Sequence, residues 1–522
     1  MNENLANQIL VALKRDGSVR LTDEALLGYL ETAVAQLDRE FRFIGVVRPG
    51  SLPGSINVPT VVAACTGGTY RGFSDLVVDE FAIALFTSVD GSIWQKLIVY
   101  SQFGKELAEI DARLDALEGE DLSMFDAFGN QLEKRSTANC YVVRKAGRFR
   151  IPLIYGNGIK AGAVNAPAYT RQGDTYTAEF VNHLGNKLTS PYIEENEGCK
   201  AASAGLLWQT AKMVTQVTLA DGFLVFDLSG VPATNGLAVL WVKDAAGRIM
   251  WSWTIWATTD DLSQIATLTN HTEVDYDMMP EGLGAIWSAD RSHYVTPHYQ
   301  WGRKDPFIPA AAYNSTTPMT TFDIVGNTYT GAGAYGADAD QDAGGTVRSV
   351  ANSIQMPEKF FLEYDETNRN WNNLAWFNNF WNAAITAANE NDDSQASAIK
   401  TIYDPCPVGW IMPASRFATG FTTSGSNVGS DAPTGCEVIG SFANGWSFKK
   451  NADDELGFFI PAAGNRNRSS GALGSVGSSG GWWTFSPSSQ AYARLLFFSA
   501  SAVYPLFTSN RSSGYAVLPS RE

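Results

Sequence analysis

Residues 1–40 carry apolar side chains at helical spacing. Leucines and valines recur three and four residues apart, and Thr22 and Asp23, which can cap a helix N-terminus, precede them. The pattern predicts an N-terminal helical segment with an amphipathic helix on Leu26, Leu27, Leu30, Val34 and Leu37.

From residue 41 to residue 101 the period changes to that of extended chain. The segments VPTVVAAC, EFAIALFTS and IWQKLIVYS are rich in β-branched and aromatic residues, which strands favour. Asp90-Gly91 lies between the last two segments, and this pair favours a tight hairpin. We expect a small β domain over residues 41–101.

Residues 102–119 place apolar side chains alternately three and four positions apart. Leu107 and Leu114 fall at a positions of a heptad register. Ile110 and Leu117 fall at d positions, and Leu at a with Ile at d favours three or four strands over two. Two interpretations stay open, because the run is short: a coiled coil that joins a homotrimer, or one amphipathic helix packed on its own domain.

The remainder of the chain divides at about residue 260. Residues 120–260 alternate large apolar residues with turn residues roughly every eight to twelve positions, which predicts a β-sandwich. In residues 261–522 strand signals thin out while Gly, Asn and Ser rise, and one helix is expected from Trp371 to Ala388. This composition favours a loop-rich α+β domain, so the whole fold is expected to be multi-domain and β-rich.

Composition and charge exclude two kinds of partner. The chain has 522 residues, too many for one hydrophobic core, and its formal net charge of −16 repels phosphate backbones. It contains no run of about eighteen apolar residues. We therefore expect neither nucleic-acid binding nor membrane insertion. The N-terminus lacks the basic and apolar regions of a signal peptide, so we expect assembly in the cytoplasm without export by the general secretory route.

Residues that could carry catalysis form no recognisable motif. The five cysteines lack CxxC spacing, and the four histidines lack the spacing of a metal site. Gly477–Gly481 matches G-x-S-x-G, but a nucleophile elbow needs a strand before it and a helix after it. In a segment rich in Gly and Ser the match is expected by chance. We expect no enzyme activity and no cofactor.

A cluster of aspartates is the one candidate for a cation site. Asp338, Asp340 and Asp342 occupy positions one, three and five of a calcium loop. Ala343 stands where such a loop needs glycine, and Ser349 stands where it needs glutamate. A solvated acidic loop is the favoured interpretation, and calcium binding is the alternative.

Several phrases resemble those of a known protein family. ANCYV at 138–142, GNG at 156–158, LW at 207–208 and WSWTIW at 251–256 resemble the β-sandwich that precedes a C-type-lectin-like domain in surface proteins of anaerobic gut bacteria. MM at 278–279, LGA at 283–285, YQWGRKDPF at 299–307, DPCPVGW at 404–410 and RSSGY at 511–515 resemble the major paralogous domain of that family. The resemblance implies a C-type-lectin-like fold for residues 261–522.

This sequence departs from the family pattern in two places. Pro280-Glu281-Gly282 stands where members carry Asp-Arg-Asn, which removes a local salt bridge. Leu518-Pro519 replaces an Arg-Cys pair that closes a disulfide in many members, so Cys406 has lost that partner. Pairing of Cys406 with Cys436 stays open.

The front of the chain is similar to the attachment end of a bacteriophage tail fibre, and the C-terminal tract resembles the variable region of proteins that phage-encoded retroelements diversify. Such proteins hold changeable side chains on a fixed lectin-like frame. The resemblance implies that the receptor-binding positions are Arg468, Ser478, Ser479, Gly481, Trp482, Phe485, Arg494, Leu496, Phe498, Tyr504, Leu506, Phe507 and Ser513.

Residues 491–498 alternate in a way that sorts these positions by face. Successive side chains of a strand point to opposite faces. We expect Ala491, Ala493, Leu495 and Phe497 to face the core, and Tyr492, Arg494, Leu496 and Phe498 to face outward. A strand buried on both faces is the alternative.

Together these features predict a tail-fibre protein located in the virion tail. It would form a homotrimer, contact other tail proteins through its N-terminal region, and bind a host cell-surface receptor, protein or polysaccharide, through its C-terminal domain. One alternative is a cellular surface or fimbrial-type adhesin. Another is a glycan-cleaving tail enzyme, which would need two carboxylates at hydrolytic separation.

Overall fold

A computed structural model divides the chain into two compact units, residues 1–117 and 118–522. It describes every residue except 1, 17–22, 36, 38–40, 54–57, 79–82, 91, 101–117, 174–175, 332, 336–348, 364–368, 373–376, 387–394, 423–435, 452 and 490. The chain is β-rich and multi-domain, as its composition and patterning predicted. The predicted coiled coil at 102–119 lies outside the described residues except for 118 and 119. Asp338, Asp340 and Asp342 also lie outside them.

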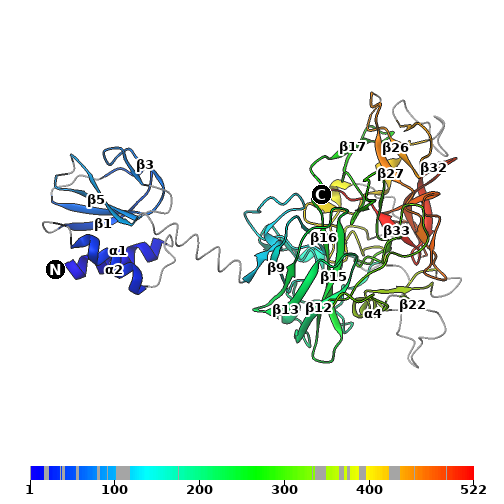
Figure 1. The fold of residues 1–522 in the computed structure, drawn as a ribbon, viewed down its shortest axis with the longest axis horizontal. Coiled ribbons are helices and arrows are strands. Elements are labelled where there is room, and N and C mark those ends of the chain that lie inside the picture. The colour runs from blue at the N-terminus through cyan, green and yellow to red at the C-terminus, as the bar shows by residue number, and fades with distance from the viewer. Residues whose placement is uncertain are drawn as a thin grey trace. The chain divides into compact units, whose positions relative to one another are not determined.

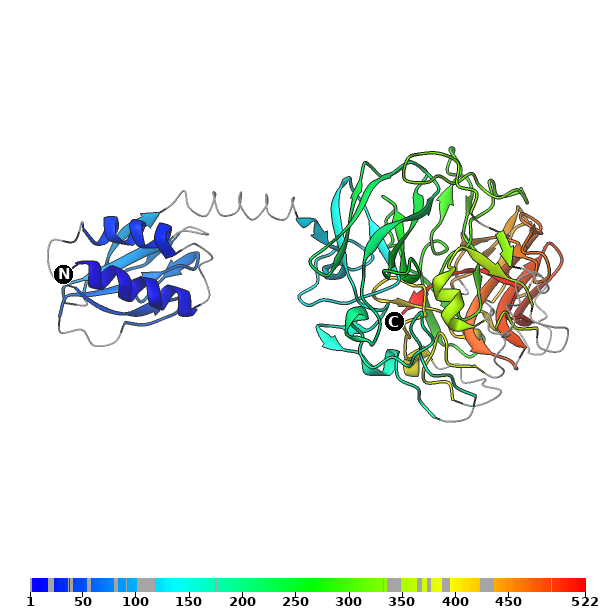
Figure 2. The ribbon, with the colours of Figure 1, turned by 90° about the horizontal axis from the view of Figure 1, so that it is seen from below.

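The first unit packs two helices on one face of a four-stranded sheet (Figures 1 and 2). The predicted amphipathic helix is confirmed as α2, and α1 adds a helix that the sequence pattern did not single out. The sheet order is β1-β2-β5-β6, with β1 parallel to β2 and the other pairs antiparallel. The elements are α1 (Asn2–Asp16), α2 (Asp23–Val34), β1 (Arg42–Val47), β2 (Thr60–Ala64), β5 (Ile83–Ser88) and β6 (Gln95–Tyr100).

Both faces of this sheet are covered, which explains why every residue of β2 and β5 is buried. Ile9, Leu13 and Leu30 of the helices meet Val61 and Leu85 on one face. On the other face the short hairpin of β3 (Gly68–Tyr70) and β4 (Leu76–Val78) packs through aromatic rings. Helices and sheet share one core, so residues 1–40 do not form a separate segment.

The second unit begins with two four-stranded sheets that line one core. In the sheet β12-β15-β16-β8 the central strand β16 is buried along its whole length, because side chains cover both of its faces. The strands are β12 (Ser203–Gln209), β15 (Gly236–Lys243), β16 (Ile249–Ala257) and β8 (Cys140–Val143) in one sheet, and β13 (Val214–Ala220), β14 (Phe223–Leu228), β9 (Gly147–Pro152) and β7 (Glu120–Asp121) in the other.

Residues 261–522 contain more strands than their sequence suggested. A seven-stranded sheet follows the order β29-β28-β33-β30-β31-β32, with β21 paired to β33, and lies on the side of the unit away from β9 and β13 (Figures 1 and 2). Its strands are β21 (Tyr299–Gln300), β28 (Asn465–Arg466), β29 (Leu473–Gly474), β30 (Ser479–Pro487), β31 (Tyr492–Ser499), β32 (Val503–Asn510) and β33 (Gly514–Val517).

The second unit also contains smaller sheets. They are β17 (Ala266–Thr269), β18 (Asp275–Met278), β34 (Ser520–Arg521) and β24 (Trp410–Ile411) in one sheet; β25 (Val438–Ile439), β26 (Gly445–Phe448) and β27 (Phe458–Pro461) in another; and the pairs β10 (Ile159–Lys160) with β11 (Ala163–Val164), β19 (Ile286–Trp287) with β20 (Tyr294–Val295), and β22 (Gly333–Tyr335) with β23 (Lys359–Phe361). The parts expected as separate domains, 120–260 and 261–522, contribute to one continuous core.

The helix expected from Trp371 to Ala388 is wrong for the described residues of that range, which form bends, turns and irregular chain. A short helix lies earlier instead, α4 (Val350–Gln355). Ser349 caps it, because the Ser349 hydroxyl accepts from the Asn352 amide at 3.1 Å.

Candidate functional site

The seven-stranded sheet ends in the edge strand β32. β31 pairs antiparallel with β30 on one side and with β32 on the other. Within the described part of the chain, no strand pairs with the outer side of β32. β32 also contains Pro505, a residue without an amide N–H that sheets tolerate mainly at edges and bulges.

Three aromatic rings cluster on the outer part of this hairpin. The Phe497 and Phe507 rings lie 4.9 Å apart and nearly parallel, and the Tyr504 ring lies 6.2 Å from Phe497 and 6.0 Å from Phe507. Phe507 is 39% exposed and its neighbour Leu506 is 41% exposed. We call Phe497, Tyr504, Leu506 and Phe507 the edge patch. Clustered apolar side chains left open to water are typical of an interaction surface.

A bulge brings these rings together. Leu495 opposes Phe507 and Phe497 opposes Tyr504, so Pro505 and Leu506 together face the single residue Leu496. The extra residue on β32 interrupts regular pairing, as bulges do. Because of the extra residue, Phe507 opposes Leu495, whereas regular pairing from Tyr504 onward would place it opposite Arg494 and further from Phe497.

A buried arginine anchors the base of the hairpin. Arg511 is fully buried and donates to the Phe377 carbonyl at 2.5 Å, to Asn378 Oδ1 at 2.6 Å and to the Ser489 carbonyl at 2.7 Å. Its guanidinium lies 4.2 Å from the centre of the Trp301 ring. Burial lowers the pKa of Arg511 to about 9, yet the group stays charged at neutral pH and holds these segments together.

The expectation that Trp482, Phe485, Leu496 and Phe498 face outward is wrong, since each is 0% exposed. The face that carries Leu496 and Phe498 is covered by β26, where the Phe448 ring meets the Phe498 ring edge-on at 5.7 Å. Phe497, expected in the core, is instead half-buried on the open side. Ala491, Ala493 and Leu495 are buried and Tyr492 and Arg494 are partly exposed, as alternation predicted, so the expectation fails only at Leu496, Phe497 and Phe498. Leu495 and Leu496 are both 0% exposed, which is the burial on both faces that the alternative predicted.

Two glycines explain why this tract mixes small residues with aromatics. A Cβ atom on Gly480 would lie 2.2 Å from the Phe498 ring, and a Cβ atom on Gly481 would lie 2.1 Å from the Tyr515 ring. Such distances are impossible without displacement of the rings, so both positions require glycine. The rings lie directly over the backbone of β30, and Gly481 is therefore a packing residue.

The other predicted residues do not all gather at the edge patch. Arg494 is half-buried beside it, and its guanidinium donates to the Leu506 carbonyl at 3.5 Å. Ser478 is exposed, and Ser479 opposes Ser499 near the hairpin tip. Two residues fall elsewhere: Arg468 forms an ion pair with Glu363 at 2.6 Å near the opposite end of the strand order, and Ser513 is only 5% exposed.

A triad-like arrangement that the sequence did not reveal lies near the first two sheets of the second unit. Cys199 Sγ is 3.9 Å from His183 Nδ1, and His183 Nε2 is 3.2 Å from Asp244 Oδ2. Burial raises the pKa of the Cys199 thiol and lowers the pKa of His183. Both side chains are 0% exposed, so the neutral thiol has no route to a substrate and the group acts as a buried polar network.

A buried acid lies in the segment Pro280-Glu281-Gly282. Glu281 is 3% exposed, and the Trp287 indole donates to its Oε2 at 2.7 Å and to Asp260 Oδ2 at 2.9 Å. Arg291 forms an ion pair with Asp260. Burial and the neighbouring Asp260 carboxylate raise the pKa of Glu281 to about 8.

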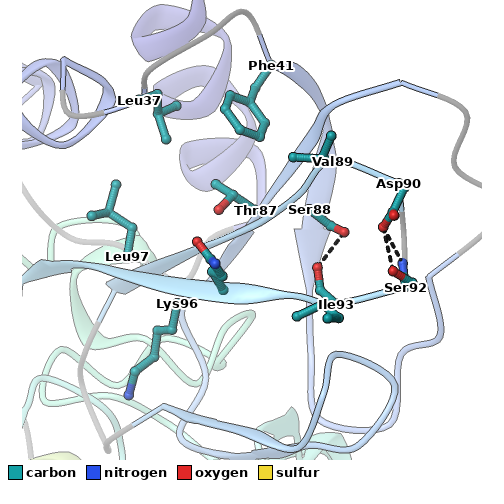
Figure 3. Close-up of a pocket in the computed structure, with 11 residues that line it drawn as sticks. Leu37, Phe41, Thr87, Ser88, Val89, Asp90, Ser92, Ile93, Lys96 and Leu97 are labelled. Atoms are coloured by element: carbon teal, nitrogen blue, oxygen red, sulfur yellow. Dashed lines mark hydrogen bonds between the residues drawn. The ribbon is translucent and has the colours of Figure 1, made fainter.

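A cavity of about 640 Å³ in the first unit lies between Leu37, Phe41 and the β5–β6 hairpin (Figure 3). Several of its polar groups bond to protein atoms: Asp90 Oδ1 accepts from the Ser92 amide at 2.9 Å, the Ser88 hydroxyl donates to the Ile93 carbonyl at 2.6 Å, and Lys96 Nζ donates to the Val77 carbonyl at 2.6 Å. The cavity therefore presents an open groove with no constellation of catalytic groups.

Two features of the described part of the chain concern metal binding and membrane insertion. There, no three His, Cys, Asp or Glu side chains come together in a group that could hold a metal ion. No helix of those residues is long and apolar enough to cross a membrane. Cys140, Cys199, Cys406 and Cys436 are buried free thiols, so Cys406 and Cys436 do not form a disulfide with each other.

Comparison with known proteins found no match to any family model, curated protein or solved structure. The assignment of a function therefore rests on the geometry described above and on the resemblance stated from the sequence.

Proposed function

We propose that this chain is the receptor-binding protein of a bacteriophage tail fibre and that it binds a host cell-surface receptor through the edge patch. The observation that carries the proposal is the ring cluster of Phe497, Tyr504 and Phe507, which is open to water on an otherwise well-packed sheet. Aromatic residues and arginine are enriched among the residues that dominate binding energy at interfaces, and Arg494 lies beside the rings.

The base of the patch supports this role. The patch strand β31 is held between β30 and β32, and Arg511 fixes the segments behind it through three backbone or side-chain acceptors. A surface held in this way loses little conformational freedom when it binds, and that loss is a main cost of association.

The test is adsorption of the fluorescently labelled full chain to a panel of anaerobic gut bacteria, measured by flow cytometry. Phe507→Ser and Leu506→Ser should each weaken adsorption by about 30-fold, which corresponds to roughly 2 kcal/mol for an interface anchor. Leu456→Ser and Val325→Ser are matched controls, because these residues are 85% and 81% exposed and lie outside the patch. Equal losses in all four variants, or no adsorption by the unaltered chain, would refute the proposal.

The proposal includes a homotrimer joined by residues 102–119. Leu114→Glu would place a charge at an a position, and a coiled coil should then lose its partners. Light scattering should give three times the chain mass of 56.5 kDa for the unaltered protein and one chain mass for the variant. A concentration-independent monomer for the unaltered protein would contradict the coiled coil.

A further inference from the structure

A separate cavity lies at the opposite end of the strand order from the edge patch. Three segments line it: the β28–β29 hairpin, the loop 307–318 and the turn between α4 and β23. Its volume is about 260 Å³. Pockets for drug-sized ligands start at about 300 Å³, so this cavity suits one small ring rather than an extended chain.

The floor of the cavity is aromatic and its rim is open. The Phe307 and Phe360 rings meet edge to face at 5.0 Å, and Leu473 lines the cavity beside them. All three side chains are buried, whereas Thr316 and Ala472 at the rim are exposed. A ligand can therefore enter from solvent and lay an apolar face on the rings.

Two buried polar groups that line the cavity keep unused bonding capacity. Arg466 is 9% exposed; its Nη1 donates to the Gly471 carbonyl at 2.8 Å and its Nη2 to the Ile308 carbonyl. Its Nε is buried and has no hydrogen-bond partner among the described residues. Glu358 Oε2 is likewise buried without a partner there. Buried polar atoms in native proteins are almost always bonded, so these two atoms leave the cavity-lining residues Arg466 and Glu358 with capacity for a further hydrogen bond.

The charges at the cavity favour a neutral ligand. Glu358 and Arg466 line the same cavity but form no ion pair with each other in the described structure. Burial raises the pKa of the Glu358 carboxyl, and this carboxyl group accepts hydrogen bonds. Arg466 donates only. An anionic ligand would meet the acid, and a cationic ligand would meet the guanidinium.

We propose that this cavity binds one neutral sugar ring, with its C–H face on Phe307 and Phe360 and its hydroxyls bonded to Arg466 Nε and Glu358 Oε2. A sugar hydroxyl both donates and accepts hydrogen bonds, so it can accept from the Arg466 guanidinium and donate to the Glu358 carboxyl. A single pyranose ring also combines an apolar face with a polar edge at the size of the cavity. The site is distinct from the edge patch, so the proposal does not depend on receptor binding there.

The test is titration of the full chain with free sugars, followed by saturation-transfer NMR. The probes are glucose, galactose, mannose and N-acetylglucosamine as neutral rings, glucosamine and N-acetylneuraminic acid as charged rings, and acetyl-leucine amide as a mimic of a peptide side chain. At least one neutral sugar should bind with a dissociation constant of about 1 to 10 mM, the range expected of so small a ligand.

Three variants locate the site. Glu358→Leu removes the carboxyl but keeps the bulk, so it should abolish sugar binding while the melting temperature holds or rises, because a buried unbonded group is lost. Ala472→Trp should block the exposed rim and weaken binding at least 10-fold. Ala246→Trp is the matched control on an exposed turn that does not line the cavity, and it should leave binding unchanged.

Each other outcome overturns the proposal. No binding of any neutral sugar removes the ligand class, and binding only of charged sugars or of acetyl-leucine amide assigns the cavity to a different ligand. Unchanged sugar binding in both Glu358→Leu and Ala472→Trp places the sugar elsewhere. None of these results bears on the adsorption variants at the edge patch, because those residues do not line the cavity.

Discussion

Phe498→Ala should destabilise the second unit far more than Phe507→Ala. Phe498 is 0% exposed, meets the Phe448 ring at 5.7 Å and lies over Gly480, which has no side chain to fill the space left behind. Deletion of a buried Phe ring lowers the free energy of unfolding by about 3 to 5 kcal/mol, and the upper part of that range is expected here because no side chain at Gly480 can fill the cavity. Phe507 is 39% exposed, so its truncation should cost only about 1 to 2 kcal/mol.

Guanidinium unfolding followed by tryptophan fluorescence measures this difference. Trp94 is the single tryptophan among residues 1–117, so the signal reports almost entirely on the second unit. The Phe498→Ala midpoint should fall clearly below that of Phe507→Ala at an unchanged slope. Equal midpoints for the two variants would show that the faces of β31 are not covered as described.

Three further outcomes follow from the packing and charges. Gly481→Ala should cost about 1 to 3 kcal/mol by overpacking against the Tyr515 ring, measured by the same unfolding assay. Arg511→Met should lower the free energy of unfolding by at least about 3 kcal/mol, because it leaves the Phe377 and Ser489 carbonyls unbonded. An unfolding midpoint equal to that of the unaltered chain would contradict the anchoring role. Glu281 keeps its proton to about pH 8 in the folded chain but loses it near pH 4.5 in the unfolded chain. The free energy of unfolding therefore falls as the pH rises from about 4.5 to about 8, by a few kcal/mol in all. Glu281→Gln cannot lose a proton, so this fall should be absent in the variant, and its stability at pH 4.5 should change little. A parallel pH profile for that variant would refute the assignment.

Local patterns predicted what local interactions determine. The apolar period placed α2, and the Asp90 turn placed the β5–β6 hairpin, because helix and hairpin contacts lie close in sequence. The face of β31 that carries Leu496 and Phe498 is covered by β26, which is remote in sequence, so alternation alone could not show that β31 is covered on both faces. Of the predicted receptor-binding residues, Ser478, Leu506 and Phe507 are exposed, and Arg468, Ser479, Arg494 and Tyr504 are partly exposed.

The failed helix has a similar cause. The aromatic spacing after residue 370 looked helical, but Trp371 donates its indole N–H to the Trp301 carbonyl at 2.8 Å, and Trp381 donates to the Tyr403 carbonyl at 3.0 Å. Asn382 Oδ1 accepts from the Ile399 amide at 2.8 Å. Asparagine side chains that bond backbone groups compete with helical hydrogen bonds, so this segment threads through the core as irregular chain. The Cys199 and His183 contact was equally invisible, since spacing alone does not encode it.

Pro505 affects whether copies of the protein held close together can associate through their strand edges. An unpaired strand edge beside exposed aromatic side chains invites a second molecule to extend the sheet, and repeated extension leads to fibres. Pro505 supplies no donor at the middle of β32, and the adjacent bulge breaks the regular spacing that an incoming strand would need. Many copies of the protein can thus expose these apolar side chains at high local concentration, while the backbone of β32 does not support growth of a continuous sheet from one copy to the next.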